Sequence, residues 1–499
     1  MKTKFKRRLM RAARYAGTKT SNQLLVLGIL SALSPAAVAD GGAGQAVVDT
    51  SQWKCASCKF EEGVSGTVDV GAGSVSEKST KFGAFNGLNK KGGYAIGDAS
   101  VRYRGKDANY WQFNAANLGL DSRAVDAEGG RQGQYKLFFH YDELPHYVSD
   151  AAQTPYIGSG GASLTLPAGF PAATTGAMPL AAALQTVDIG TKRKRLGVGA
   201  SWITTSNWEY AVRFRHETKD GTKSTAGSFF VDSAQLVEPV DYVTDQVDAS
   251  ATYTGKKLQM KFAYYGSTFR DGNSALTWQD PYTPIAGEAA GQLALPPDNQ
   301  FHQIQAAGGY QLSDKTRLSG DIAYGRMTQN DSFLAYTQNP NLLMPNGTPG
   351  MANPGGSLNG RVATLDAGLK LYSAVTQRLR LNAAYTHNAR DNQTPQATYQ
   401  TFITDMFTNA AVTRTNLPYS FKEDKLKLSA NYRASAKLRG AVGADFDAHR
   451  RTFQEVDTTR DNTVWGKVSS QVSDKLDLTL KLTHGKRSNS GYHAVNDIA

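Results

Sequence analysis

Residues 306–324 read AAGGYQLSDKTRLSGDIAY, and this stretch sets the pattern for most of the chain. On each side of the central SDKT, apolar side chains occupy alternate positions: Tyr310 and Leu312 before it, Ile322 and Tyr324 after it. Successive side chains of a β-strand point to opposite faces, so each arm has one apolar face and one polar or small face. Serine and aspartate favour tight turns because they bond to their own backbone. The stretch therefore predicts a β-hairpin with two unlike faces.

The same alternation recurs along the chain. In residues 476–482, leucines alternate with Asp477, Thr479 and Lys481. A charged face on nearly every strand is typical of a barrel with a wet or protein-filled lumen rather than of a globular sandwich. The pattern predicts 17 strands, at 65–76, 94–104, 109–117, 121–129, 133–141, 193–203, 208–219, 243–254, 258–269, 301–312, 316–327, 361–373, 378–388, 422–434, 437–449, 461–472 and 476–485.

The connections between these strands alternate in length. Short turns are predicted at 204–207, 255–257, 313–316, 374–377, 435–436 and 473–475. Long connections rich in Pro, Gly and Asn are predicted at 142–192, 220–242, 270–300, 328–360, 389–421 and 450–460. Outer-membrane barrels have short periplasmic turns and long external loops. The chain is therefore predicted to be all-β, a large antiparallel transmembrane β-barrel.

Two further features bear on this barrel. Tyr264, Tyr324 and Tyr385 occupy similar places in strands that lead to long loops. They are expected to form an aromatic girdle at the outer interface, although tyrosine also favours strands in general. The strand count of 17 is odd, whereas closed bacterial barrels have even counts, and no closing strand with a terminal aromatic residue is present. We therefore expect the sequence to lack a carboxy-terminal part of the barrel.

The amino terminus has the features of a secretory signal. Residues 1–39 carry eight of the lysines and arginines, an apolar run at 24–33 and the small-residue site Ala37-Val38-Ala39. These eight charges reduce the formal net charge of +12 to +4 for the remainder, so nucleic-acid binding is not indicated. The predicted organisation is a signal peptide at 1–39, a periplasmic segment at 40–64 and a barrel at 65–499.

Cys55 and Cys58 are the only cysteines, in the sequence WKCASCK. Covalent c-type haem requires a histidine where Lys59 stands, and two thiolates alone do not complete a zinc site. A small disulfide loop is expected in an oxidising periplasm, with a redox or docking role as the alternative. The eight histidines show no ligand spacing, and no catalytic triad, phosphate loop or paired carboxylate site is present. No enzymatic activity, metal or bound cofactor is predicted.

Several segments are more specific than a general barrel pattern. NLGLDSRAVDAEGGRQGQYKLFFHYDELPHYVS at 117–149, WKCASC at 53–58, FGAFNGLN at 82–89 and the late segment at 453–492 resemble the MtrB/PioB family of decahaem-associated outer-membrane barrels. The sequences TPYIGSG and LTLPAGF, which follow residue 149, belong to the same resemblance. Cys55 and Cys58 match the amino-terminal CxxC of that family. Members of the family are usually longer, which agrees with the odd strand count.

The resemblance implies a sheath around a partner. A periplasmic decahaem c-type cytochrome would insert into the lumen and carry electrons across the outer membrane, with an extracellular multihaem cytochrome as a further partner. The haems would belong to the partner, and the barrel would contact lipid on its outside. Small or polar lumen residues would face the guest, namely Gly309, Gln311, Ser319, Ser429, Asn431 and Thr479. The alternatives are a solute-diffusion porin without a cytochrome and a periplasmic adhesion or structural β-protein.

Overall fold

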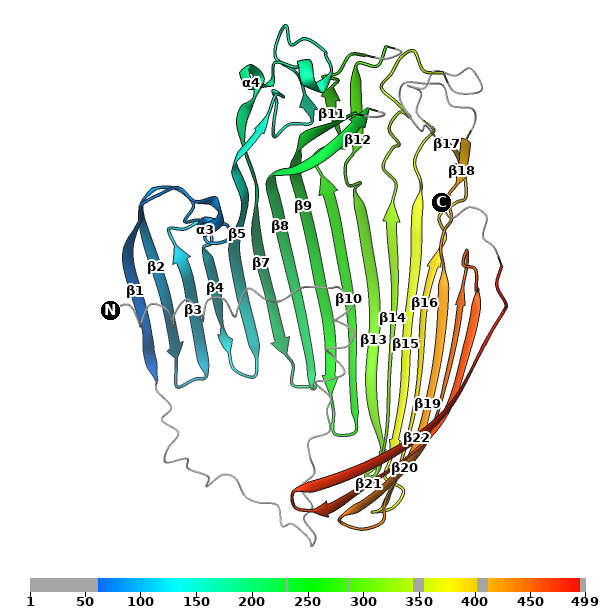
Figure 1. Cartoon of the computed structure of the whole chain (residues 1–499). Coiled ribbons are helices and arrows are strands. Elements are labelled where there is room, and N and C mark those ends of the chain that lie inside the picture. Colours follow the sequence, from blue (N-terminus) through cyan, green and yellow to red (C-terminus); the bar gives the residue numbers. More distant parts are fainter. Residues whose placement is uncertain (1–61, 230–231, 285–286, 344–353, 402–411, 494–499) are drawn as a thin grey trace. The chain divides into compact units, whose positions relative to one another are not determined.

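The computed structural model describes residues 62–229, 232–284, 287–343, 354–401 and 412–493, and these form one antiparallel sheet with additions at one end (Figure 1). Neighbouring strands of the sheet follow one another in sequence, as in a chain of hairpins. The 17 strands are β1 (Gly63–Val75), β2 (Gly92–Arg104), β3 (Asn109–Leu118), β4 (Ala124–Arg131), β5 (Tyr135–Thr154), β7 (Gln185–Ile203), β8 (Trp208–Phe229), β9 (Asp232–Thr254), β10 (Leu258–Asp271), β13 (Asn299–Ser313), β14 (Thr316–Gln329), β15 (Gly360–Ser373), β16 (Leu379–Asn392), β19 (Phe421–Arg433), β20 (Leu438–Arg451), β21 (Thr458–Ser473) and β22 (Leu476–Asn489).

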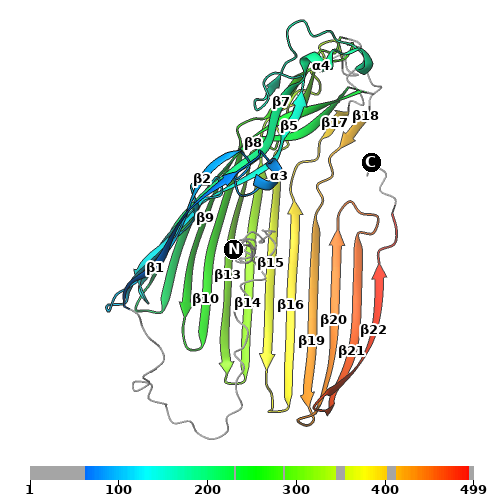
Figure 2. The ribbon, with the colours of Figure 1, turned by 60° about the vertical axis from the view of Figure 1, so that its left-hand side comes forward.

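All 17 predicted strands are confirmed, with bounds that differ by a few residues in most of them. The hairpin at 306–324 is β13–β14, with Gly309 opposite Ser319 and Tyr310 opposite Leu318. Its turn is closed as expected, because the Ser313 hydroxyl accepts a hydrogen bond from the backbone N–H of Lys315 at 3.3 Å. Between β21 and β22, the Ser473 hydroxyl accepts from the N–H of Lys475 in the same way. The short turns lie together at one end of the sheet, and the long connections gather at the other (Figure 2).

The two edges of the sheet are β1 and β22. Among the described residues, β1 pairs with β2 alone and β22 pairs with β21 alone. Since the 17 strands alternate in direction, β1 and β22 run the same way. No helix in the described part of the chain is long and apolar enough to cross a membrane.

Two of the predicted long connections are wrong in part, because the strands beside them are longer than expected. The segment 142–192 contains the end of β5 and the start of β7, and 220–242 is almost entirely the continuation of β8 and β9. β8 and β9 pair from Trp208 opposite Tyr253 through to Phe229 opposite Asp232. The outer part of β9 shows no alternation, because its consecutive residues 236–240 are all buried. Burial on both faces removes the period-two pattern from which the other strands were predicted.

The additional elements lie in the connections. A small sheet of β6 (Ser163–Leu164), β11 (Ala275–Gln279) and β12 (Ala290–Ala294) covers the outer parts of β8 and β9, and a hairpin is formed by β17 (Thr398–Thr401) and β18 (Val412–Thr415). The described helices are short, namely α3 (Thr80–Gly83), the 3-10 turn η2 (Thr175–Ala177) and α4 (Leu180–Ala183).

The main buried core of the described residues lies in this outer region, not between the strands of the large sheet. We call it the outer cluster, and it consists of Tyr156, Leu164, Leu166, Phe229, Ala234, Leu236, Leu276, Trp278 and Leu295. Trp278 is 4% exposed and packs edge-on against Phe229, with ring centroids 5.9 Å apart. Beside the cluster, burial raises the pKa of the Asp280 carboxyl, whose Oδ1 accepts a hydrogen bond from the backbone N–H of Tyr282 at 2.9 Å. Three long connections are thereby packed into one structured unit.

Candidate functional site: the polar face of the sheet

The pairing register gives the large sheet two chemically different faces. Leu428 lies opposite Ala383 on β16 and Ala444 on β20, whereas its neighbour Ser429 lies opposite Asn382 and Gly443. Residues directly opposite each other share a face, so the same division extends across the sheet. We call the side of Leu428 the apolar face and the side of Ser429 the polar face. Large side chains of the apolar face are exposed, including Phe262, Ile304, Ile322, Leu428, Val442 and Leu480.

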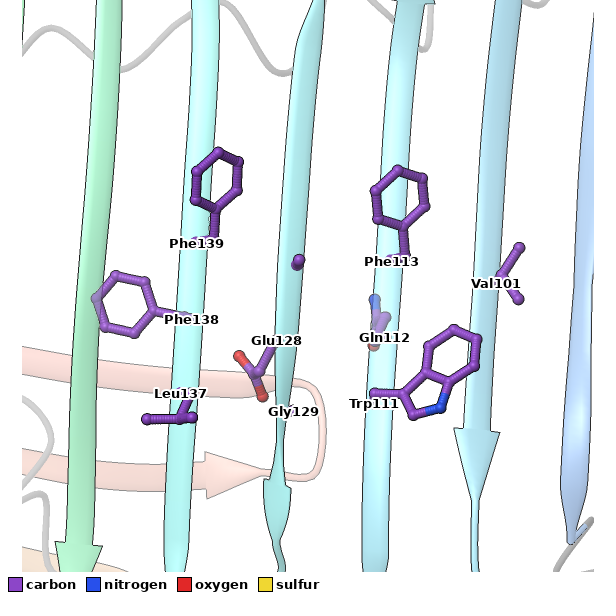
Figure 3. Close-up of a pocket in the computed structure, with 10 residues that line it drawn as sticks. Val101, Trp111, Gln112, Phe113, Glu128, Gly129, Leu137, Phe138 and Phe139 are labelled. Carbon is purple, nitrogen blue, oxygen red and sulfur yellow. The ribbon is translucent and has the colours of Figure 1, made fainter.

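The apolar face contains a groove lined mainly by apolar side chains. Small residues on β4, among them Gly129, form its floor, with Trp111 and Phe113 on one side and Leu137 and Phe139 on the other (Figure 3). Its volume is about 710 Å³. An exposed apolar surface that continues over many strands is costly in water and is stable against lipid. The apolar face is therefore the lipid-facing surface.

Aromatic residues border the apolar face at both ends. Tyr264, Tyr324 and Tyr385 lie on it as predicted, with exposures of 38%, 46% and 40%. The Tyr264 hydroxyl lies 2.8 Å from His302 Nδ1, and the Tyr385 hydroxyl donates to Asp424 at 2.6 Å, so polar partners meet the rings on their outer side. Aromatic rings with wet tips are typical of a membrane interface.

A second group of aromatic residues, which the sequence did not predict, lies at the short-turn end of the apolar face. Trp202 stacks on Tyr210 at 5.2 Å between centroids, and Trp208 contacts Tyr253 at 5.3 Å. These four residues flank the short turns 204–207 and 255–257, and that flanking position was the signal that could have identified them. Together with the outer tyrosines they mark the two borders of the apolar band.

The polar face carries the residues that were predicted to meet a guest. Gly309 lies opposite Ser319, and Gln311 lies opposite Arg317, all on this face. The Ser429 hydroxyl accepts a hydrogen bond from the Asn382 side-chain amide at 3.3 Å. Farther along the sheet, the hydroxyls of Ser469 and Thr479 lie 2.9 Å apart. At these positions the polar face carries short side chains that are bonded to one another.

Between β4 and β8 the polar face holds a network of paired charges. The Asp142 carboxylate accepts from Arg195 Nε at 2.6 Å and lies 3.4 Å from Arg193. It also lies 2.7 Å from His140 Nε2, and the other ring nitrogen of His140 lies 2.5 Å from Asp126. The Asp142 side chain is 13% exposed, so these partners compensate a largely buried charge. The network fixes β5 against β7.

Replacing Asp142 with alanine is expected to lower the stability of the folded barrel by about 1–3 kcal/mol, because the cations around it lose their acceptor. The measurement is the temperature at which the detergent-solubilised protein loses its compact, heat-modifiable band on a gel. Asp477→Ala is the control, since Asp477 is exposed on β22 and forms no ion pair within the described residues. Equal melting of the two variants would contradict a structural role for the network.

The structure does not describe the two cysteines that were predicted as a disulfide or redox pair. Cys55 and Cys58, with residues 1–39 and most of the segment 40–64, lie outside the described residues. In the described part of the chain no group of three or more His, Cys, Asp or Glu side chains has an arrangement that could hold a metal ion. His216 and His387 each contact one aspartate at 2.7 Å.

Comparison with known proteins agrees with this architecture. The family described as "Putative outer membrane beta-barrel porin, MtrB/PioB" matches residues 75–498. The Outer membrane protein MtrB of Shewanella baltica (strain OS185) is 33% identical over 479 residues, which is 94% of this chain and 67% of the relative.

The chain also matches solved structures of outer-membrane uptake proteins, with low TM-scores. The ferric yersiniabactin uptake receptor FyuA from Yersinia pestis has a TM-score of 0.37 at 12% identity, over 86% of this chain and 62% of the receptor. The copper transporter OprC has a TM-score of 0.39 at 11% identity, over 86% of this chain and 64% of the transporter. From the family match and the relative, the protein is a transmembrane β-barrel of the outer membrane, and the chain belongs to the MtrB/PioB family.

Proposed function

We propose that this barrel sheathes a periplasmic multihaem c-type cytochrome and so forms an electron conduit across the outer membrane. The observation that carries the proposal is the polar face, which the pairing register lines with small and hydrogen-bonding side chains over many strands. Such a wall allows close approach and water-mediated contacts to an inserted protein. The resemblance of residues 117–149 to the family supports the same reading.

The size of the sheet is compatible with an inserted protein. Strands about 4.8 Å apart and tilted by about 40° each occupy roughly 6 Å of wall, so the strands present here make an arc on the order of 100 Å. A circle of that circumference is roughly 34 Å across, the size class of barrels with 16–18 strands, which enclose an open lumen, and it leaves room for a slender protein.

The physical need for a sheath comes from the membrane. The apolar band of an outer-membrane barrel is about 25 Å tall, and a bare haem protein cannot expose its polar surface to hydrocarbon. The barrel supplies an apolar exterior and a polar interior, while the partner supplies the redox centres. An extracellular multihaem cytochrome could then receive or donate electrons at the outer end, where the outer cluster gives the long connections a fixed shape.

The test is purification of the tagged protein from outer membranes, followed by haem staining and mass spectrometry of what accompanies it. We expect a c-type cytochrome in near-equal molar amount, and vesicles holding the complex should reduce an enclosed dye when an external reductant is added. A haem-free preparation that conducts ions in planar bilayers would contradict the proposal and support the porin alternative.

A further inference from the structure

At the short-turn end, the polar face carries a group of cations that we call the basic wall. It lines a cavity of about 540 Å³ and consists of Arg378, Arg380, Arg433, Arg439 and Lys467. These residues come from β16, β19, β20 and β21 and from the turn before β16, and all five are exposed. Asn382, Asn431 and Ser469 provide neutral polar groups between them.

The described part of the chain supplies no anion to this wall. No Asp or Glu lines the cavity, and none of the five cations forms an ion pair within the described residues. The acid-free character is local, because Asp366, Asp445 and Asp447 occupy the polar face nearer the long-connection end of β15 and β20. The basic wall is therefore confined to the short-turn end, which is periplasmic in outer-membrane barrels.

The strand register places like charges of the polar face directly opposite each other, which destabilises the barrel when it has no partner. Arg433 lies directly opposite Arg439 across β19 and β20. Lys467 lies directly opposite Lys481 across β21 and β22. Like charges at directly opposed positions destabilise a pair of strands. Two such pairs on the same face indicate that an external anion compensates them.

The polar face near the other edge of the sheet differs from the basic wall, because its charges are paired. On β4, β5 and β7 the polar-face charges pair within the chain, as Glu128 does with Lys136 at 2.6 Å and Asp142 with Arg195 at 2.6 Å. That sector can face either water or a neutral guest without unpaired charge. The basic wall cannot, because a guest that covered it would have to desolvate uncompensated cations.

We infer that the basic wall docks an acidic patch of Asp and Glu side chains on the inserted cytochrome, and so fixes its rotation and depth in the lumen. This inference rests on the proposed function. Guanidinium groups bind carboxylates bidentately, which gives the contact a defined geometry. Attraction from the mouth of the barrel would also speed insertion, since complementary charge raises association rates.

Anionic lipid is a different partner and fits less well. Arg380, Arg433 and Arg439 lie on the polar face, opposite in parity to the lipid-facing Leu428. Headgroups could reach Arg378 in the turn, but not the three strand positions without entering the lumen. The geometry therefore favours the guest.

The test compares the complexes formed by three tagged barrels in which three cations are replaced. The first carries Arg380→Gln, Arg433→Gln and Arg439→Gln, and the second carries lysine at the same positions. The third is the matched control, Arg213→Gln, Arg215→Gln and Lys261→Gln, which removes the same charge from the polar face at β8 and β10. Each complex is washed with increasing salt, and retained c-type haem per barrel is measured by its absorbance.

We expect the first variant to retain at least tenfold less haem than wild type at about 0.3 M salt, the lysine variant to retain an intermediate amount because it keeps the charge but not the bidentate geometry, and the control variant to stay within about twofold of wild type. A carbodiimide that joins carboxylates to amines should also link Lys467 to an Asp or Glu of the cytochrome, identified by mass spectrometry. Equal retention by all variants and wild type would overturn the inference and leave the proposed function standing. Loss of bound anionic phospholipid with haem unchanged would also overturn it, and a wild-type barrel without haem would remove both proposals.

Discussion

Leu428→Arg is expected to abolish accumulation of the folded barrel in the outer membrane. Leu428 lies near the middle of β19 on the apolar face, between Ala383 and Ala444, and is 40% exposed to the surroundings. An arginine at the middle of the lipid-facing band costs about 2–4 kcal/mol. Since folded proteins have a net stability of only about 5–15 kcal/mol, this is a large fraction of the total. The measurement is the amount of heat-modifiable protein in purified outer membranes.

The neighbouring position provides the control. Ser429→Arg changes the same strand by one residue, but places the cation on the polar face, where Asn382 and Gly443 are its cross-strand neighbours. This variant should assemble to at least half the wild-type level. If both variants assembled equally, or if only the Ser429 variant failed, the assignment of the two faces would be wrong.

The alternation of side chains was sufficient to predict the large sheet, because every central strand has one lipid-facing and one polar face. Leu476, Leu478, Leu480 and Leu482 illustrate this, since all four are exposed on a strand that the pattern located to within a few residues. The outer parts of β8 and β9 could not be found in the same way. Residues 236–240 of β9 are all buried although successive side chains point to opposite faces, so burial on both faces hides the strand period.

The polar face was likewise predictable by parity, since a residue two positions away shares its face. The individual contacts were not. Asp142 and Arg195 are separated by 53 residues and meet only because β5 pairs with β7 in one register. In contrast, the opposition of Arg433 and Arg439 could have been deduced, because they flank a short hairpin turn symmetrically. The aspartate partners of His216 and His387 could not be predicted either, because they lie 29 and 37 residues away on the neighbouring strands.

Trp278→Ala is expected to open the outer cluster while the large sheet stays assembled. The indole is 4% exposed and fills space left by Gly227 and Gly291, where an added Cβ would lie only 2.1 and 2.2 Å from the ring. Replacing a buried tryptophan with alanine costs about 3–5 kcal/mol, which should loosen the packing of the outer cluster. Protease added to intact cells should therefore cut the long connections at least tenfold faster. Trp111→Ala is the control, because Trp111 is 41% exposed on the apolar face and its loss should leave the cleavage rate unchanged. Equal cleavage of both variants would mean that the outer cluster does not hold the connections together.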